Sequence, residues 1–129
     1  MKNIRNIVLI DDSEVDNLIH KTLLERNHFA EDIKSFESST EALSSIQESA
    51  KKAKVPDLIL LDIAMPVMDS YEFLDEFEKI DSQLVSACKV IIVTSSVNPK
   101  DKEKSLKRDS VDGFLIKPLT EKVLLTILN

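Results

Sequence analysis

Five short apolar runs, spread along the whole chain, constrain its fold more than any other feature. They lie at 7–10, 33–36, 58–61, 90–93 and 113–116. The runs IVLI, LILL and VIIV contain no polar residue, which is typical of strands covered on both faces. The run IKSF at 33–36 is a weaker candidate, because two of its four residues are polar. The chain is therefore predicted to contain five strands.

Longer amphipathic stretches separate and follow these runs. The first is predicted to form a helix of about four turns, with an inner stripe of Val15, Leu18, Ile19, Thr22 and Leu23. Ser38–Glu41 resembles a capping box before the second helix, and Asp69-Ser70 can cap the third. The fourth is predicted over Pro99–Asp109, with Leu106 as its single apolar anchor, and the last over Thr120–Leu128. We expect the fourth helix to be weakly docked for that reason.

Strict alternation of strands and helices predicts an α/β fold, with a doubly wound five-stranded parallel sheet and helices on both faces. The 129 residues suffice for one domain, expected over 1–129. Net charge is −6, which argues against a nucleic-acid surface. No apolar run approaches the length of a membrane helix, and the N-terminus is not a signal peptide. With Cys88 as the sole cysteine, a reducing, cytoplasmic location is expected.

Polar residues follow four of the predicted strands. They are Asp11-Asp12, Asp62, Thr94 and Lys117-Pro118. In a parallel sheet the carboxyl ends of the strands meet at one edge, where ligands bind. Crowded carboxylates repel one another unless a cation neutralises them, and Mg²⁺ prefers oxygen ligands of this kind. Beside a hydroxyl and an ammonium, the site would suit a phosphoryl group, with Asp62 as nucleophile.

Each of these residues also has an ordinary structural interpretation. Asp11, Asp12 and Ser13 could cap the first helix, and Asp62 could be a solvated turn residue. Thr94 could belong to a loop and Lys117 to the surface. These readings leave unexplained why reactive side chains end four different strands. His20 and His28 lack metal-ligand spacing and are expected at the surface or the rim.

These motifs resemble those of the receiver domain of two-component response regulators. The resemblance covers the whole length of the chain and is carried by Asp11-Asp12 after VLI, LLDIAMPVMDS, IIVTSS and GFLIKPLT. It implies a CheY-like, flavodoxin-like sheet of order 2-1-3-4-5 with five flanking helices. It also implies that Asp62 accepts a phosphoryl group from a histidine kinase or histidine phosphotransfer protein, in two-component signal transduction, and that the chain is not an enzyme with an external substrate.

The resemblance implies roles for the other site residues. Asp12, Asp62 and the carbonyl of Ala64 would bind Mg²⁺ directly, and Asp11 largely through water. Lys117 would pair with the phosphoryl oxygens, next to a cis peptide bond to Pro118. Thr94 would move toward the phosphoryl group, with Phe114 as the switch aromatic. Ser70 departs from the family, which usually has glycine there.

Two other interpretations remain open. A magnesium-dependent phosphatase with an aspartyl nucleophile usually needs a second carboxylate two residues later, where this chain has Ala64. A receiver-like scaffold that takes no phosphate is disfavoured, because the acidic pair, Asp62, Thr94 and Lys117 are all present. The downstream protein target, the kinase and the oligomeric state do not follow from the sequence.

Overall fold

The structure is a computed structural model that describes residues 5–63 and 69–128. The strands and helices alternate as the sequence predicts, with one additional helix. Their order is β1 Asn6–Ile10, α1 Glu14–Arg26, β2 Asp32–Phe36, α2 Ser39–Ala50, β3 Leu58–Leu61, α3 Ser70–Phe77, α4 Ser82–Ala87, β4 Lys89–Thr94, α5 Pro99–Leu106, β5 Gly113–Ile116 and α6 Glu121–Leu128.

All five strands pair in parallel in one sheet of order β2-β1-β3-β4-β5. The predicted doubly wound fold and strand order are confirmed. β1 and β3 lie inside the sheet, and their last residues, Ile10 and Leu61, are direct partners. The register therefore places the residues that follow β1 and β3 side by side at the same edge.

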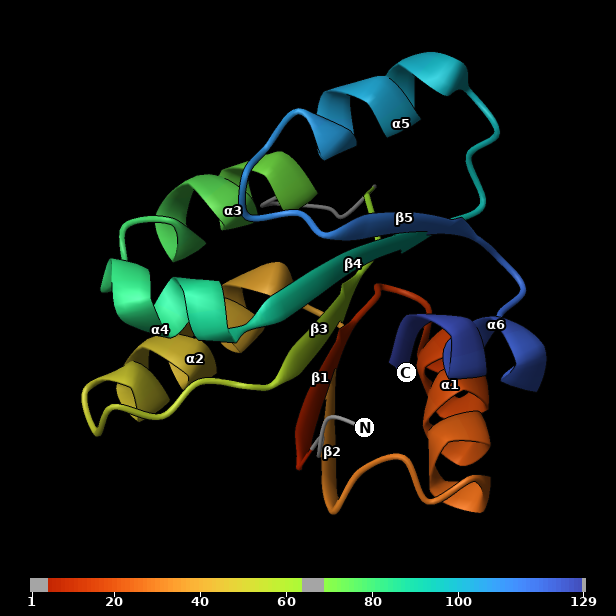
Figure 1. The fold of residues 1–129 in the computed structure, drawn as a ribbon, viewed down its shortest axis with the longest axis horizontal. Helices are drawn as coiled ribbons and strands as arrows, with labels where there is room; N and C mark the ends of the chain where they lie inside the picture. The colour runs from red at the N-terminus through yellow and green to blue at the C-terminus, as the bar shows by residue number, and fades with distance from the viewer. Residues whose placement is uncertain (1–4, 64–68, 129) are drawn as a thin grey trace.

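Helices cover both faces of the sheet (Figure 1). On one face, α2 and α3 pack on alternate residues of the central strands, and the largest side chains there are Phe73 and Phe77, both fully buried. Their rings stack with centroids 6.0 Å apart. On the other face, α1 and α6 contribute Leu24 and Leu124 to a second core cluster. Because both faces are covered, the strands read as continuous apolar runs.

The predicted inner stripe of α1 is wrong except at Leu23, which is partly buried against the second core cluster. Val15, Leu18 and Ile19 are 65%, 64% and 51% exposed, whereas the buried residues of the helix are Asn17, His20 and Leu24. The expectation that His20 lies at the surface or the rim is also wrong, since it is 5% exposed. Hydrogen bonds of Asn17 explain in part why α1 presents a different face to the sheet than predicted. The side-chain amide of Asn17 donates to the carbonyls of Asp11 and Phe36 at 2.9 and 3.1 Å. These bonds turn a polar face of α1 toward the strand ends.

The region between β3 and β5 departs from prediction in two places. A short helix, α4, precedes β4 and was not predicted, since its six residues carry too little periodicity. Helix α5 ends at Leu106 rather than at Asp109, and Leu106 is 43% exposed. The buried residue of α5 is Ser105, so the predicted apolar anchor is replaced by a polar one.

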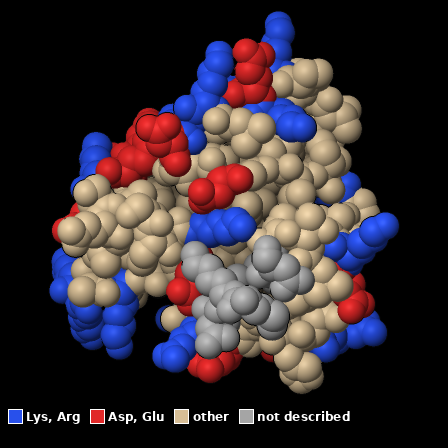
Figure 2. Space-filling view, in the orientation of Figure 1, with Lys and Arg blue, Asp and Glu red and all other residues tan. Residues whose placement is uncertain are grey.

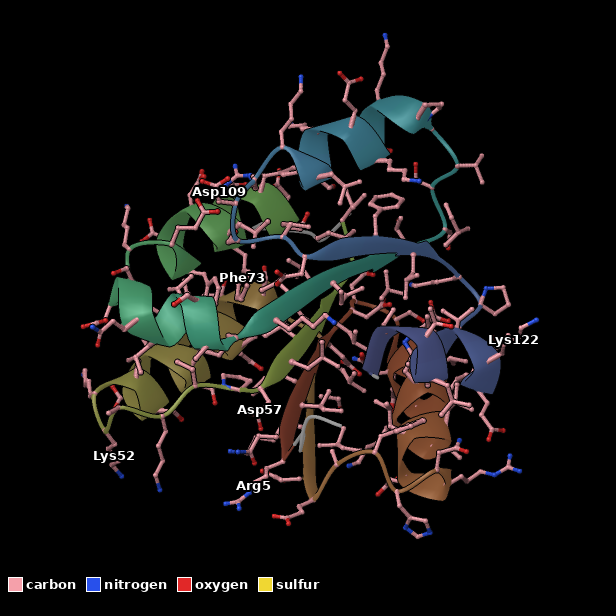
Figure 3. The ribbon with its side chains drawn as sticks, viewed as in Figure 1. Arg5, Lys52, Asp57, Phe73, Asp109 and Lys122 are labelled. Carbon is pink, nitrogen blue, oxygen red and sulfur yellow. The ribbon has the colours of Figure 1, made fainter. Side chains whose placement is uncertain are left out.

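The two edges of the sheet differ in what they hold. At the amino edge, the backbone amides of Arg5 and Asn6 donate to the Asp57 carboxylate at 2.8 and 3.0 Å, which joins β1 to β3 (Figure 3). The Asp57 carboxylate therefore has a structural role at this edge. The carboxyl edge gathers the polar residues described next. Among the described residues, no helix is long and apolar enough to cross a membrane.

Candidate functional site

Three aspartates meet at the carboxyl edge of the sheet. Asp11 and Asp12 follow β1, Asp62 follows β3, and carboxylate oxygens of all three lie within 4.8 Å of one another. Asp11 is 4% exposed, Asp62 is 9% exposed, and Asp12 is exposed to solvent. The backbone holds this arrangement, because the Asp62 amide donates to the Ile10 carbonyl and the Asp11 amide to the Phe36 carbonyl. Three carboxylates at this spacing suit a hard divalent cation.

Lys117 reaches the same edge from the end of β5. Its ammonium donates to the carboxylates of Asp11 and Asp16 at 2.5 and 2.7 Å, and lies 3.9 Å from Asp62 Oδ2. Only 12% of the lysine side chain is exposed. The ammonium thus partly neutralises the acidic cluster from one side.

The charges of the site shift the pKa values of its groups. Burial raises the pKa of Asp62 to about 6, with help from the neighbouring Asp11 charge, although Lys117 and the Ile63 amide oppose the shift. Burial works against the charged form of Lys117, yet its hydrogen bonds to Asp11 and Asp16 and the nearby Asp62 charge raise its pKa overall. A cation bound among the carboxylates would lower the pKa of Asp62 again.

Thr94 and Phe114 complete the set of predicted switch residues. Thr94 is the last residue of β4 and is 4% exposed, and its carbonyl accepts from the Lys117 amide at 2.8 Å. Phe114, in β5, is half-buried and packs against the core cluster of α2 and α3. The Lys117–Pro118 peptide bond is cis, as the resemblance implies.

The loop after β3 holds the remaining predicted site residue. Ala64, the expected carbonyl ligand, lies outside the described residues. On the far side of this loop, Ser70 is fully buried, and its hydroxyl and amide both donate to the Ile63 carbonyl at 2.8 and 3.3 Å. Asp69 caps α3 in a reciprocal capping box with Glu72. Ser70, where the family usually has glycine, thus contributes a hydrogen bond close to Asp62.

Two residues of the site were not predicted from the sequence. Asp16 accepts a hydrogen bond from Lys117, and His20 lies one helical turn further on and is 5% exposed. Burial lowers the pKa of His20, as does the Lys117 charge. The spacing of four residues from Asp16 to His20 indicates one face of a helix. The apolar residues of α1, by contrast, predict a different inner face.

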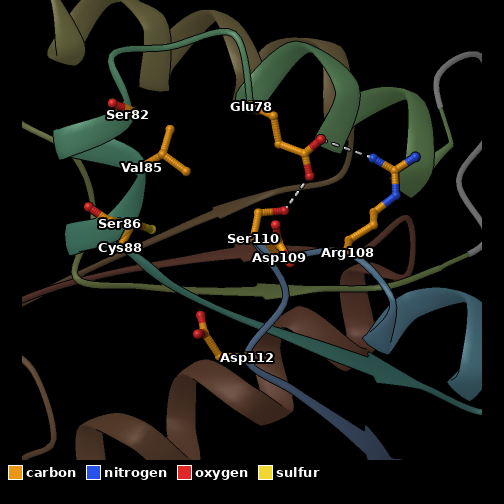
Figure 4. Close-up of a pocket in the computed structure, with 9 residues that line it drawn as sticks. All are labelled: Glu78, Ser82, Val85, Ser86, Cys88, Arg108, Asp109, Ser110 and Asp112. Atoms are coloured by element: carbon orange, nitrogen blue, oxygen red, sulfur yellow. Dashed lines mark hydrogen bonds and ion pairs between the residues drawn. The ribbon is translucent and has the colours of Figure 1, made fainter.

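A separate cavity of about 600 Å³ lies at the opposite, amino edge of β4 and β5 (Figure 4). Its wall includes Cys88 and Asp112, which immediately precede those strands. On one side of the cavity, the Glu78 carboxylate accepts hydrogen bonds from Arg108 Nη1 at 3.2 Å and from Ser110 Oγ at 2.5 Å. These bonds tie the end of α3 to the segment after α5, so the polar groups they join have structural partners.

The surface in Figure 2 shows basic and acidic side chains interspersed. Helix α5 carries three lysines and two acidic residues among its eight, and Lys104 lies over the Tyr71 ring, 4.1 Å from its centroid. A nucleic-acid site would require basic side chains gathered on one face. The lysines of α5 therefore fit a solvated helix that contacts α3.

Comparisons with known proteins agree with this geometry. The family model of the response regulator receiver domain matches residues 7–129. The chemotaxis protein CheY of Halobacterium salinarum is 30% identical over 115 residues, which are 88% of this chain and 85% of that protein. Hybrid signal transduction histidine kinase I of Dictyostelium discoideum is 30% identical over 125 residues, 97% of this chain, but the match spans only 7% of that protein.

A solved structure extends the agreement to three dimensions. A two-component response regulator of Cytophaga hutchinsonii superposes with a TM-score of 0.89 at 29% identity, covering 98% of this chain and 95% of that one. The acidic triad occupies the strand ends at which receivers carry their phospho-accepting site. The fold, the triad and the family match agree, and the chain belongs to the response regulator receiver domains, which are signalling modules rather than conventional enzymes.

Proposed function

We propose that this chain accepts a phosphoryl group on Asp62 from a phosphohistidine of a histidine kinase or histidine phosphotransfer protein. The observation that carries the proposal is the position of Asp62. Its carboxylate is nearly buried at the end of β3, beside two further carboxylates and 3.9 Å from the Lys117 ammonium. A carboxylate that served only as a solvated turn residue would not need these charged neighbours.

The reaction would transfer the phosphoryl group from a P–N bond of the donor to a P–O bond on Asp62. A carboxylate oxygen of Asp62 attacks phosphorus, the P–N bond of the phosphohistidine breaks, and the imidazole nitrogen keeps the electron pair and takes up a proton. Lys117 is placed to bond the phosphoryl oxygens, since its ammonium already lies at the edge of the acidic cluster. Thr94, whose carbonyl accepts a hydrogen bond from the Lys117 amide, would supply a hydroxyl donor.

The residues present fit a magnesium ion. Asp12 and Asp62 would bind it directly and Asp11 largely through water, with the Ala64 carbonyl as a further ligand. When bound, Mg²⁺ would neutralise charge that develops on the phosphoryl oxygens. The same carboxylates would otherwise repel an incoming phosphoryl group, so the transfer should require a divalent cation.

Signalling would follow from the added charge. A phosphoryl group brings nearly two negative charges and three strong acceptors to a site where Thr94 and Lys117 are the nearby donors. Movement of Thr94 toward the phosphoryl group would open space behind it for Phe114, which is now half-buried. The conformational switch is thus expected to reach β5 and the helices beside it.

Intact-mass spectrometry tests the proposal. After incubation with acetyl phosphate or phosphoramidate and Mg²⁺, the protein should gain about 80 Da, the mass of one phosphoryl group. The gain should need Mg²⁺ and vanish in Asp62→Asn. A matched control is Asp32→Asn, which makes the same exchange at an exposed position at the start of β2.

Two results would contradict the proposal. An adduct that persists in Asp62→Asn would place the phosphoryl group on another residue. No adduct from either small donor or from a phosphorylated histidine phosphotransfer protein, although Mg²⁺ binds, would favour a receiver-like scaffold that takes no phosphate. Sustained release of inorganic phosphate from an added phosphoester would instead support the phosphatase interpretation.

A further inference from the structure

Among residues 5–63 and 69–128, Asp16 is the one carboxylate bonded to Lys117 that stands outside the acidic triad. It comes from the first turn of α1, whereas Asp11 and Asp62 follow strands. Its carboxylate accepts from Lys117 Nζ at 2.7 Å, and this ion pair lowers the pKa of Asp16. The side chain is 34% exposed, so the pair sits at the rim of the site.

The position of Asp16 is held by the local structure of α1. Ser13 caps the helix, and its hydroxyl accepts from the Asp16 amide at 3.2 Å. The next residue, Asn17, is 4% exposed and joins α1 to the ends of β1 and β2 through the carbonyls of Asp11 and Phe36. Asp16 therefore offers a fixed acceptor on the helix side of the site.

Lys117 and a divalent cation would compete for the same carboxylates. Both are cations, and both are attracted to the carboxylates of Asp11 and Asp62. The ammonium already donates to Asp11, and if it also moved onto Asp62 it would occupy the oxygens of both carboxylates and repel Mg²⁺. An acceptor that is not itself a metal ligand can hold the ammonium nearby without that competition.

We propose that Asp16 is a positioning residue, which holds the Lys117 ammonium on the α1 side of the site and leaves Asp62 accessible to the cation and the phosphoryl donor. The inference rests on the proposed function, because it assigns Asp16 a part in preparing that site. It agrees with the resting position of the ammonium, which donates to Asp11 at 2.5 Å and to Asp16 at 2.7 Å but lies 3.9 Å from Asp62.

A simpler role for Asp16 makes a different prediction. Acidic residues stabilise the first turn of a helix through the helix dipole, and α1 has two of them, Glu14 and Asp16. If Asp16 acted only as a helix-terminal charge, removing either charge would have a similar effect. Glu14→Gln is therefore the matched control for Asp16→Asn, since Glu14 is exposed and lies in the same turn.

The first measurement follows Lys117 directly, without phosphate or metal. The side-chain ammonium is observed by ¹⁵N NMR in wild type, Asp16→Asn, Asp16→Glu and Glu14→Gln. We expect the Lys117 signal to shift, and its hydrogens to exchange faster with water, in Asp16→Asn only. Asp16→Glu should restore most of the wild-type signal. An unchanged Lys117 signal in Asp16→Asn would overturn the proposal.

The second measurement is Mg²⁺ affinity, followed by the amide signals of Ile63 and Thr94. Asp16→Asn should weaken Mg²⁺ binding about three- to tenfold, because the ammonium then relies on Asp11 and Asp62. In a Lys117→Met background the same substitution should change the Mg²⁺ affinity less than about twofold, since the Lys117 ammonium that Asp16 would position is absent. Equal losses in both backgrounds would show that Asp16 acts as a plain charge, and would overturn the proposal.

These measurements separate failure of the inference from failure of the proposed function. If wild type bound no Mg²⁺ and formed no adduct, the proposed function would fail, while the Lys117 signal would still decide the role of Asp16. If wild type bound Mg²⁺ and formed the adduct but Asp16→Asn matched Glu14→Gln in both measurements, only the inference would fail.

Discussion

The hydroxyls of Tyr71 and Ser105 lie 3.2 Å apart and join α3 to α5 through a hydrogen bond. Ser105 is fully buried, and the Tyr71 ring also lies under Lys104 and near Arg108. Arg108 in turn pairs with Asp75 on α3 at 2.9 Å. Helix α5, whose one well-buried residue is a serine, is thus held to α3 by polar and cation–π contacts.

Tyr71→Phe should loosen α5 without disturbing the sheet. The variant keeps the ring beneath Lys104 but leaves the buried Ser105 hydroxyl without its partner, which costs about 1 kcal/mol. Amide hydrogen exchange in α5 should become faster, while exchange in β1 and β3 stays the same. Adding Ser105→Ala should recover part of the loss, because both partners are then apolar. Equal acceleration throughout the sheet would mean that the bond supports the whole fold.

Asp62→Asn should stabilise the metal-free protein at neutral pH. The pKa of Asp62 is raised to about 6, against 3.8 for the group without these neighbours. Between these values the native state binds more protons than the unfolded state, so stability falls as pH rises from about 4 to about 6 and stays lower above that range. Since the group is partly hydrated and Lys117 lies near it, we expect a gain of about 1–2 kcal/mol at pH 7.

Urea unfolding of Asp62→Asn and wild type at pH 4 and pH 7, in buffer with a chelator, measures this effect. The stability difference should be largest at pH 7 and nearly absent at pH 4, and Mg²⁺ should stabilise wild type more than the variant. A difference that was the same at both pH values would exclude the Asp62 carboxylate as its source.

Gly113 should tolerate a methyl group poorly, because of one neighbour. A Cβ at this position would lie 2.9 Å from Ile91 Cδ1, in the adjacent strand β4. Gly113→Ala should therefore cost about 1–3 kcal/mol by thermal or urea unfolding. In an Ile91→Val background, which removes that methyl, the cost should shrink to less than about 1 kcal/mol. The same cost in both backgrounds would point to the backbone rather than to the contact.

Ser70→Ala should destabilise the protein by about 1 kcal/mol, because the buried hydroxyl donates to the Ile63 carbonyl at 2.8 Å. The carbonyl keeps the weaker bond from the Ser70 amide, so the loss should be moderate. Urea unfolding measures it, with Ser82→Ala in the first turn of α4 as a control for a serine in a helix. A loss no greater than that of the control would show that the hydroxyl contributes little.

Several features of the fold were predictable from local sequence. The three all-aliphatic runs became the three central strands, since each is buried on both faces by helices that the neighbouring amphipathic stretches form. Ser13, Ser38 and Asp69 became helix caps, because a side-chain oxygen at those positions satisfies an amide in the first turn. The short helix α4 escaped prediction for the opposite reason, since six residues are too few to show a period.

The outward-facing stripe of α1 shows where local pattern misleads. Apolar spacing predicted that Val15, Leu18 and Ile19 face the core, but the core side carries Asn17 and His20. A buried polar side chain is stable only where partners exist, and the amide hydrogens of Asn17 bond carbonyls at the ends of two strands that meet only in the folded sheet. No pattern within the helix contains that information. The same cause hid Asp16 and the buried Ser105.

The sequence by itself determined the order of strands and helices and the residues at the strand ends, because hydrophobic period and capping act over a few residues. Only the tertiary structure decided how those end residues share their charges. Asp11 and Asp16 meet Lys117 across about a hundred residues of chain, and both bond its ammonium, whereas Asp62 lies 3.9 Å from it. Electrostatic interaction depends on separation in space and on burial, and both arise only when the sheet is assembled.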